Sequence, residues 1–207
     1  MLRTACYTFV ALATAAVSAH AGVVINEVMY RPYNQLTFGR FEYTEVTNTD
    51  STPVDLSGAY FTDSQDFASI CAGFEPHDHE GVFAIPSGTV VAPGGYLTFT
   101  HGGITGPNTV NYTVQVFFSN IVLNDGGDQV SIIRCSGTTP IVIDSFDYAT
   151  LGLGETPANV SLERIDPSGP TQDASNWAFT LVPPGANTGE YVPGGTPGAQ
   201  NSVFAGD

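Results

Sequence analysis

The sequence VVINEVMY at residues 23–30 is followed by FEYTEVTN at 41–48 and by DLSGAYFTD at 55–63. All three segments are rich in β-branched and aromatic residues, which favour strands. Asn, Asp, Pro and Ser-Gly residues, which favour turns, separate them. In 41–46, and again in 141–148, apolar and polar residues tend to alternate, so that the two faces of each strand differ in character. This pattern predicts consecutive strands of an antiparallel β protein.

Turn-forming residues continue to separate short strand-like segments along the rest of the chain. Further strands are expected at 82–85, 95–100, 112–118, 129–134, 141–148 and 160–165, with a last extended piece near 176–180. No segment after the N-terminal region shows a sustained apolar period of 3.6 residues, so no long helix is expected. Short strands at this spacing favour an all-β fold, an immunoglobulin-like β-sandwich.

Several sequence blocks resemble those of a known family. They are Ile-Asn-Glu-Val at 25–28, Glu-Tyr-Thr-Glu at 42–45, Ile-Pro-Ser-Gly-Thr at 85–89, Pro-Gly-Gly-Tyr at 93–96, Leu-Asn-Asp-Gly-Gly-Asp at 123–128, Ser-Leu-Glu-Arg at 161–164, Trp177, and Gly-Thr-Pro-Gly-Ala-Gln-Asn at 195–201. In this order they resemble the lamin tail domain in its bacterial secreted form. The resemblance implies the same immunoglobulin-like fold.

The resemblance has two departures. Tyr43 stands where the family often has Trp, and the long segment from Asp63 to Gly81 has no counterpart in the family pattern. The resemblance also implies that Trp177 is buried at the end of the sandwich.

The N-terminus has the features of a secretory signal. A single Arg3 precedes an apolar run from Ala5 to Val17, and Ala19 and Ala21 supply the small residues that a signal peptidase reads. We therefore divide the chain into a cleaved signal peptide at 1–21, a β-sandwich domain at 22–182, and a Pro/Gly-rich segment and tail at 183–207. The part of this last segment that resembles the family is expected to lie extended against the sandwich, and residues 203–207 to form a free end.

The chain is strongly acidic, with 20 Asp and Glu, five arginines, no lysine and a formal net charge of −15. Such a surface repels phosphate backbones and anionic lipids, which argues against nucleic-acid binding and membrane-surface docking. No apolar run after the signal is long enough to span a membrane. A solvated acidic coat on an exported protein is the simplest interpretation.

Two cysteines, Cys71 and Cys135, remain once Cys6 leaves with the signal peptide. An even number of cysteines in an oxidising compartment predicts a disulfide between them. Neither lies beside a histidine or a helix start that would make it a reactive thiol.

Two loops contain possible metal ligands. His77, His79 and Glu80, with His101 after the next strand, could supply nitrogen and carboxylate ligands for zinc or copper if 77–80 is extended. Asn124, Asp125 and Asp128 could form a calcium loop shared with the acidic loop at 63–66, but the Asp-Gly pair equally fits a hairpin turn. A solvated loop is the simpler interpretation of the first and a hairpin turn that of the second, and no other cofactor is expected.

No catalytic pattern is recognised. Nucleophile-elbow and phosphate-binding motifs are absent from the sequence, and Glu42 and Glu45 should point to opposite faces of one strand. We expect a non-enzymatic extracellular or cell-surface module for protein interaction or attachment, whose partner is a protein or a surface polymer. The alternative is a secreted metal- or carbohydrate-binding protein that uses the His77–Glu80 loop or the aromatic stretch Tyr30–Tyr43.

Overall fold

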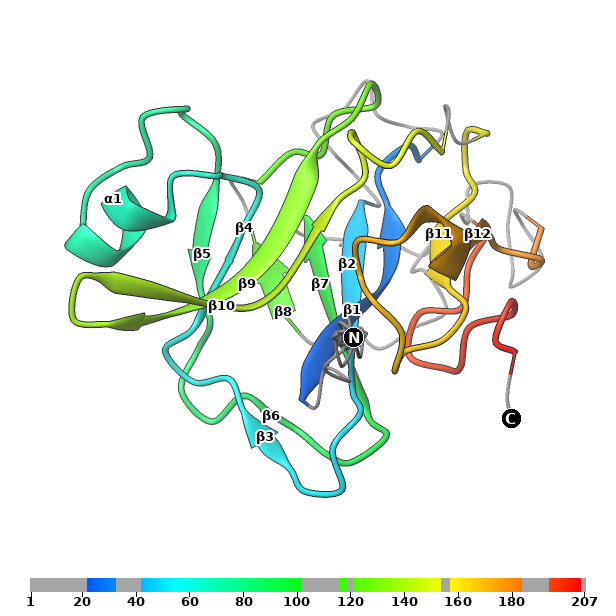
Figure 1. Ribbon diagram of the computed structural model, residues 1–207, viewed down its shortest axis with the longest axis horizontal. Helices are drawn as coiled ribbons and strands as arrows, with labels where there is room; N and C mark the ends of the chain where they lie inside the picture. Colours follow the sequence, from blue (N-terminus) through cyan, green and yellow to red (C-terminus); the bar gives the residue numbers. More distant parts are fainter. Residues whose placement is uncertain are drawn as a thin grey trace, which may run out of the picture.

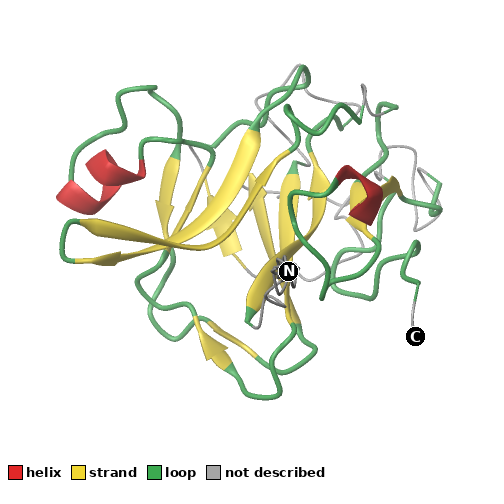
Figure 2. Ribbon diagram, viewed as in Figure 1, coloured by secondary structure: helices red, strands yellow, loops and turns green. Residues whose placement is uncertain are grey.

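Two β-sheets pack face to face in the computed structural model, which describes residues 22–32, 42–101, 116–118, 121–153, 157–183 and 194–205 (Figures 1 and 2). The first sheet has the order β12-β11-β1-β2-β7-β8, with β1 at Val23–Met29, β2 at Tyr43–Asn48, β7 at Tyr96–His101, β8 at Val116–Phe118, β11 at Leu162–Arg164 and β12 at Trp177–Phe179. The second has the order β10-β9-β4-β5, with β4 at Tyr60–Thr62, β5 at Val82–Ala84, β9 at Gln129–Ser136 and β10 at Thr139–Asp147.

The pairing is antiparallel except between β7 and β8, and the immunoglobulin-like β-sandwich expected from the sequence is confirmed. A small additional pair, β3 at Val54–Asp55 and β6 at Val90–Val91, was not predicted. Neither was the helix α1 at Phe67–Ala72, nor the 3-10 turn η2 at Ala174–Asn176. In the described part of the chain no helix is both long and apolar enough to cross a membrane.

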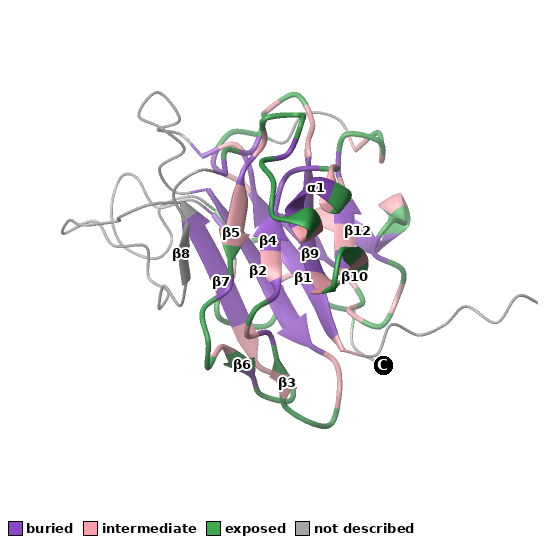
Figure 3. Ribbon diagram, turned by 90° about the vertical axis from the view of Figure 1, so that its left-hand side faces the viewer, coloured by how far each residue is buried: buried purple, intermediate pink, exposed green. Residues whose placement is uncertain are grey.

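Three stacked aromatic pairs join the two layers. Phe61 of β4 stacks on Phe99 of β7, with ring centroids 4.6 Å apart. Phe146 of β10 stacks on Trp177 of β12 at 3.8 Å, and Tyr30 stacks on Tyr148 at 4.3 Å. In Figure 3 the strands of the two layers are coloured mostly as buried. Trp177 is only 4% exposed and donates its indole N–H to the carbonyl of Thr171, so the predicted burial of this residue is confirmed.

A β-bulge in β1 decides which side chains face the core. The register to β2 shifts between Ile25 and Glu27, so Asn26 is the extra residue. Val23 and Ile25 before the bulge and Val28 after it all belong to the core, which the strict period of two would not allow. The bulge therefore turns Glu27 to the outer face of the first sheet.

The backbone of Ile25, beside the bulge, is bonded by side chains. Asp144 of β10 accepts from the Ile25 N–H at 2.7 Å, and Arg164 of β11 donates to the Ile25 carbonyl at 2.9 Å. The two side chains also form a buried ion pair at 3.5 Å. Since buried backbone groups need partners, this pair satisfies the polar groups at the bulge while it links the sheets.

The insertion at 63–81 forms a lobe with the end of the β9–β10 hairpin. Asp66 caps the start of α1 and Gly73 ends it in the left-handed conformation, which suits glycine. Cys71 of α1 and Cys135 of β9 form the predicted disulfide, with Cα atoms 5.4 Å apart. We call α1, Gly73, Phe74 and the hairpin end 133–142 the disulfide lobe (Figure 1).

The disulfide is expected to contribute substantially to stability, because it closes a loop with a sequence separation of 64 residues. The chain-entropy model gives about 4 kcal/mol for a loop of this size. The Cys71→Ser/Cys135→Ser protein should therefore unfold at a clearly lower denaturant concentration. An unchanged midpoint, measured by Trp177 fluorescence in urea, would contradict this assignment.

Candidate functional site

Three glutamates from three neighbouring strands are buried on the outer face of the first sheet. They are Glu27 of β1, Glu45 of β2 and Glu163 of β11, and none has measurable exposure. Glu27 lies opposite both Glu45 and Glu163 in the strand register. Their hydrogen-bond donors are neutral groups: Tyr43, which donates its hydroxyl to Glu27 at 2.6 Å, Asn26, Thr98, and a segment from the end of the chain.

This segment, residues 194–205, covers the three glutamates, and we call it the clasp. The amide of Thr196 donates to Glu27 at 3.0 Å, and its hydroxyl donates to Glu163 at 2.9 Å. The amide of Gly198 donates to Glu45, and Ser202 and Val203 both donate to Glu163. The carboxylates of the first sheet therefore serve as acceptors that hold the last described part of the chain.

The clasp differs in two respects from the sequence prediction. It packs against the sandwich as expected, but it runs through turns closed by Ala199 N–H to Thr196 and Phe204 N–H to Asn201, and it is not extended. Residues 203–205 are also not a free end, because Val203 and Ala205 donate backbone hydrogen bonds to Glu163 and Ile165. The sequence shows the Pro and Gly residues of this segment, but not that the amides of Thr196, Gly198 and Val203 donate to buried glutamates.

A groove of about 530 Å³ opens between the clasp and the ends of β2 and β7. Its floor is fixed by Asn201, whose amide donates to the carbonyls of Asn26 and Arg164, both at 2.8 Å. Two rings, Tyr96 and Phe204, and two carboxylates, Asp50 and Asp166, line it. Sequence analysis did not identify this groove, because its lining comes from five separate segments of the chain.

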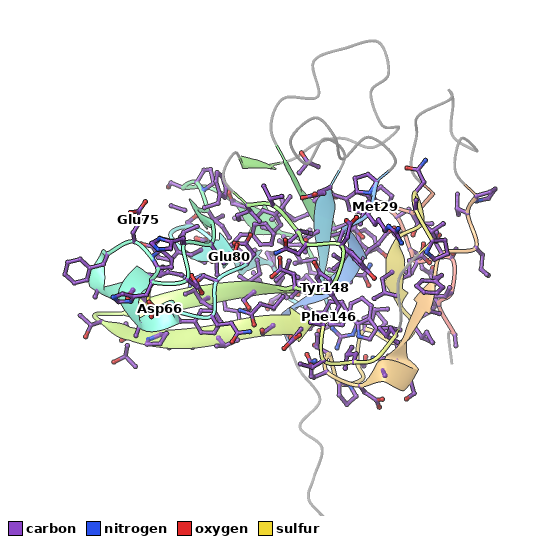
Figure 4. The ribbon with its side chains drawn as sticks, turned by 90° about the horizontal axis from the view of Figure 1, so that it is seen from above. Met29, Asp66, Glu75, Glu80, Phe146 and Tyr148 are labelled. Carbon is purple, nitrogen blue, oxygen red and sulfur yellow. A yellow bond between two sulfur atoms is a disulfide. The ribbon has the colours of Figure 1, made fainter. Side chains whose placement is uncertain are left out.

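A second hollow, of about 620 Å³, lies beside the disulfide lobe and is lined largely by acidic residues, including Asp63, Asp78, Glu80 and Asp128. Figure 4 places Asp66 and Glu80 near α1, away from the aromatic pair Phe146 and Tyr148. Burial and the neighbouring charge of Asp128 raise the pKa of Asp63 to about 7, and burial also raises the pKa of Asp128. We call this hollow the acidic recess.

The predicted metal ligands His77, His79 and Glu80 lie in a turn, not in the extended segment that we expected. His79 N–H donates to the Pro76 carbonyl, and His79 has a φ of 64°. Asp66 accepts from Nδ1 of His77 at 2.5 Å, so this ring is tied to the cap of α1. The backbone of His101 ends β7, but its side chain is outside the described structure. The described residues contain no group of three or more His, Cys, Asp or Glu side chains placed to hold a metal ion.

Ser69 also lies 3.0 Å from Nδ1 of His77, so a serine, a histidine and an aspartate meet here. Both contacts use the same ring nitrogen. A hydrolytic triad needs its acid and its nucleophile on different nitrogens, so that the ring can pass a proton between them. The arrangement therefore caps a helix and does not activate Ser69.

The proposed calcium-loop residues form a turn in which Gly127 N–H donates to the Asn124 carbonyl. Asp128 accepts from the backbone and side chain of Asn124, and Asp125 pairs with Arg31 at 3.6 Å. The hairpin expected here is wrong, because 121–123 is not a strand. Instead, the amides of Val122 and Leu123 donate to Asp63 and Glu42. As predicted, Glu42 and Glu45 lie on opposite faces of the first sheet and bond to separate segments.

Tyr30 and Tyr43, at the two ends of the aromatic stretch, are 3% and 1% exposed. Neither presents a face to solvent on which a sugar could stack. Tyr33, Phe38 and Phe41, between them, lie outside the described residues.

Comparison with protein families identifies the family of this chain. The family model described as Lamin Tail Domain matches residues 16–150. The chain belongs to the lamin tail domain family. The match starts within the predicted signal peptide and ends before β11 and the clasp. Membership of this immunoglobulin-like family supports a non-catalytic module.

Among solved structures, the chain is similar to the crystal structure, at 2.50 Å resolution, of a DUF4876 family protein from Bacteroides thetaiotaomicron VPI-5482. The identity is 11% and the TM-score 0.46, over 77% of this chain and 68% of that chain. A search of the curated proteins found no match.

Burial gives this lamin tail domain several carboxyl groups that keep their protons near neutral pH. Burial and the neighbouring Glu163 raise the pKa of Glu27 from 4.5 to about 7. Burial and Glu27 raise the pKa of Glu45, and burial also raises the pKa of Glu42 to about 8. The clasp thus covers two groups, Glu27 and Glu45, that hold their protons more tightly in the folded state than in the unfolded chain.

Stability should therefore fall as the pH rises. Between pH 4.5 and about 8 the folded state holds protons that the unfolded chain releases, so the free energy of unfolding is highest below this window and decreases through it. We expect Tm to be lower at pH 8 than at pH 5 by at least about 5 °C. Glu27→Gln should flatten this dependence, whereas Glu75→Gln, at an exposed position, should leave it unchanged; a Tm that rises towards pH 8 would refute the assignment.

Gly195 is the tightest point of the clasp. It has a φ of 156°, and a Cβ there would press on the Tyr43 hydroxyl and lie 2.5 Å from Glu27 Oε1. Gly195→Ala should lower the free energy of unfolding by about 2–4 kcal/mol and make the clasp sensitive to thermolysin. Gly126→Ala is the control, since a Cβ there meets nothing within 4 Å. Equal stability of the two variants would show that the clasp does not pack as described.

Proposed function

We propose that this lamin tail domain is an exported, non-catalytic module that attaches to a protein or polymer at the cell surface. The observation that carries the proposal is the character of the groove. Its walls offer rings, carboxylates and neutral hydrogen-bonding groups, and among the described residues no histidine or cysteine lines it. These groups suit binding, whereas hydrolysis needs an activated nucleophile or a positioned acid and base.

The buried carboxylates support the same proposal. Glu27, Glu45 and Glu163 are the most enclosed acids of the first sheet, and they are bonded to the clasp. A general acid must reach its substrate, and these groups cannot do so while the clasp covers them. The raised pKa values of Glu27 and Glu45 arise mainly from their burial in the closed fold.

Export is supported by the N-terminal sequence and by the disulfide. The apolar run and small residues before Gly22 have the pattern of a cleaved signal peptide. Disulfides such as that between Cys71 and Cys135 persist in oxidising compartments.

A protein partner is favoured by a different surface. The disulfide lobe exposes Phe74, Ile141 and Val142, of which Phe74 is 71% exposed. Large apolar side chains that remain exposed on a stapled lobe are suited to contact another protein. The groove and the lobe therefore offer two separable routes of attachment.

The attachment is tested with labelled protein spanning residues 22–207 and intact cells of the organism that produces it. Retention should be saturable, and it should fall at least about tenfold either in Tyr96→Ala/Phe204→Ala protein or in Phe74→Ser/Ile141→Ser protein. The variant that loses retention identifies the surface. No saturable retention of the wild-type protein would contradict attachment.

The same protein is expected to show no hydrolase or transferase turnover, with or without zinc, copper or calcium. A broad substrate screen run beside the His77→Ala/His79→Ala protein checks this. Turnover that the double substitution abolishes, in a variant that remains folded, would establish a metal-dependent enzyme.

The alternative, a secreted metal-binding protein, is favoured by one observation, the number of carboxylates at the acidic recess, which His77 and Glu80 also line. Metal analysis of the purified protein distinguishes it. A stoichiometric ion that is lost in the His77→Ala/His79→Ala protein would support it.

A further inference from the structure

Two aromatic rings lie in the groove without being buried in the core. Phe204 is 39% exposed although it is at the end of the clasp, where a turn to Asn201 fixes the backbone. Tyr96, at the start of β7, is half-buried and stands beside the clasp. Exposed rings within a concave surface provide flat apolar platforms, and the C–H face of a pyranose ring is a matching surface.

Hydrogen-bond acceptors flank the rings. Asp166 accepts from the Ser168 amide through one oxygen and is exposed to solvent, and Asp50 lies on another wall of the groove. Gln200 and Ser168 add neutral polar groups, both exposed. Carboxylates that accept from neighbouring hydroxyl groups form strong, directional bonds. Rings beside carboxylates and amides thus match a ligand with apolar faces and hydroxyl edges.

The walls of the groove are held in place before any ligand arrives. Asn48, in the wall beside Asp50, donates to the carbonyls of Thr52 and Val91, both at 2.9 Å, and Asn201 bridges Asn26 and Arg164. A site that is already ordered loses little conformational entropy when it binds. Its volume of about 530 Å³ is within the range of small-molecule sites and suits a short stretch of a saccharide.

Charge restricts the kind of saccharide. Two carboxylates, Asp50 and Asp166, line the groove, no arginine of the described part of the chain does so, and the whole chain has a formal net charge of −15. An anionic polymer would be repelled both by the groove and by the field of the molecule. A cationic peptide would be attracted, but it would leave the two rings and the neutral amide and hydroxyl groups without a matching surface.

We infer that the groove between the clasp and β7 binds a neutral polysaccharide, with Tyr96 and Phe204 as stacking platforms and Asp50 and Asp166 as hydroxyl acceptors. The inference rests on the proposed function, because the polysaccharide would be the surface polymer to which the exported domain attaches. Phe204 and Gln200 belong to the clasp, so the binding site is complete only when the clasp is packed against the first sheet.

The test is titration calorimetry of residues 22–207 with cellohexaose, chitohexaose, xylohexaose, mannohexaose and maltohexaose. Hexagalacturonate serves as the anionic probe and hexalysine as the cationic peptide. At least one neutral oligosaccharide should bind, and the affinity should fall at least tenfold in Phe204→Ala and in Asp166→Asn. Val122→Ala, at an exposed position that does not line the groove, should bind like the wild type. Phe204 is partly exposed, so the Phe204→Ala protein is expected to fold. Trp177 fluorescence is the measurement that checks its folding.

Three results would overturn the inference: no binding of any neutral hexaose, equal or tighter binding of hexagalacturonate or hexalysine, or neutral binding that Phe204→Ala and Asp166→Asn leave intact. The cell experiment separates this failure from failure of the proposed function. Retention on cells without binding of neutral hexaoses would support the proposed attachment and reject the polysaccharide as its ligand. Binding of a hexaose without retention on cells would support the polysaccharide site and reject the proposed attachment.

Discussion

Three carboxyl groups buried side by side on one face of a sheet are the constraint on which the rest of this structure depends. Glu27, Glu45 and Glu163 have no exposure, and neutral donors surround them. A buried carboxyl group needs either a proton or hydrogen-bond donors, and preferably both. The clasp supplies amides and hydroxyls from a part of the chain more than a hundred residues away from β1 and β2 in sequence. It thereby converts an outer face that would be wet into a second, polar interior.

This polar interior sits opposite an apolar one. The core between the sheets is held by stacked aromatic pairs and by the ion pair of Arg164 and Asp144 at the bulge. The bulge at Asn26 connects the two interiors, because it turns Glu27 outward while Val28 continues the core. Loss of the bulge would reverse the faces of Glu27 and Val28, so a single extra residue determines where the clasp can bind.

The apolar–polar alternation and the turn residues predict the sandwich and most of its strands, because both signals are carried by residues close together in the sequence. The cysteine count leads to the disulfide, because only two cysteines remain after the predicted signal peptide. The features that were missed depend on contacts between distant segments. Glu27 stands in a strand made mostly of apolar residues, and this was the available signal for a buried acceptor, whereas Leu-Glu-Arg at β11 gives no such signal. The helix α1 was missed because six residues are too few for a helical period to be recognised, and its Asp66 cap is a single residue.

The position of the clasp in the chain has a consequence for how the protein is made. β1 begins at Val23, directly after the predicted signal peptide, whereas the groups that close over it are at residues 196–203. Contacts of such high sequence separation form slowly, because the intervening chain must first be ordered. A nascent chain that lacks the clasp has these glutamates uncovered and its groove unfinished. The polar interior of the first sheet is therefore completed only after residues 196–203 have been synthesised.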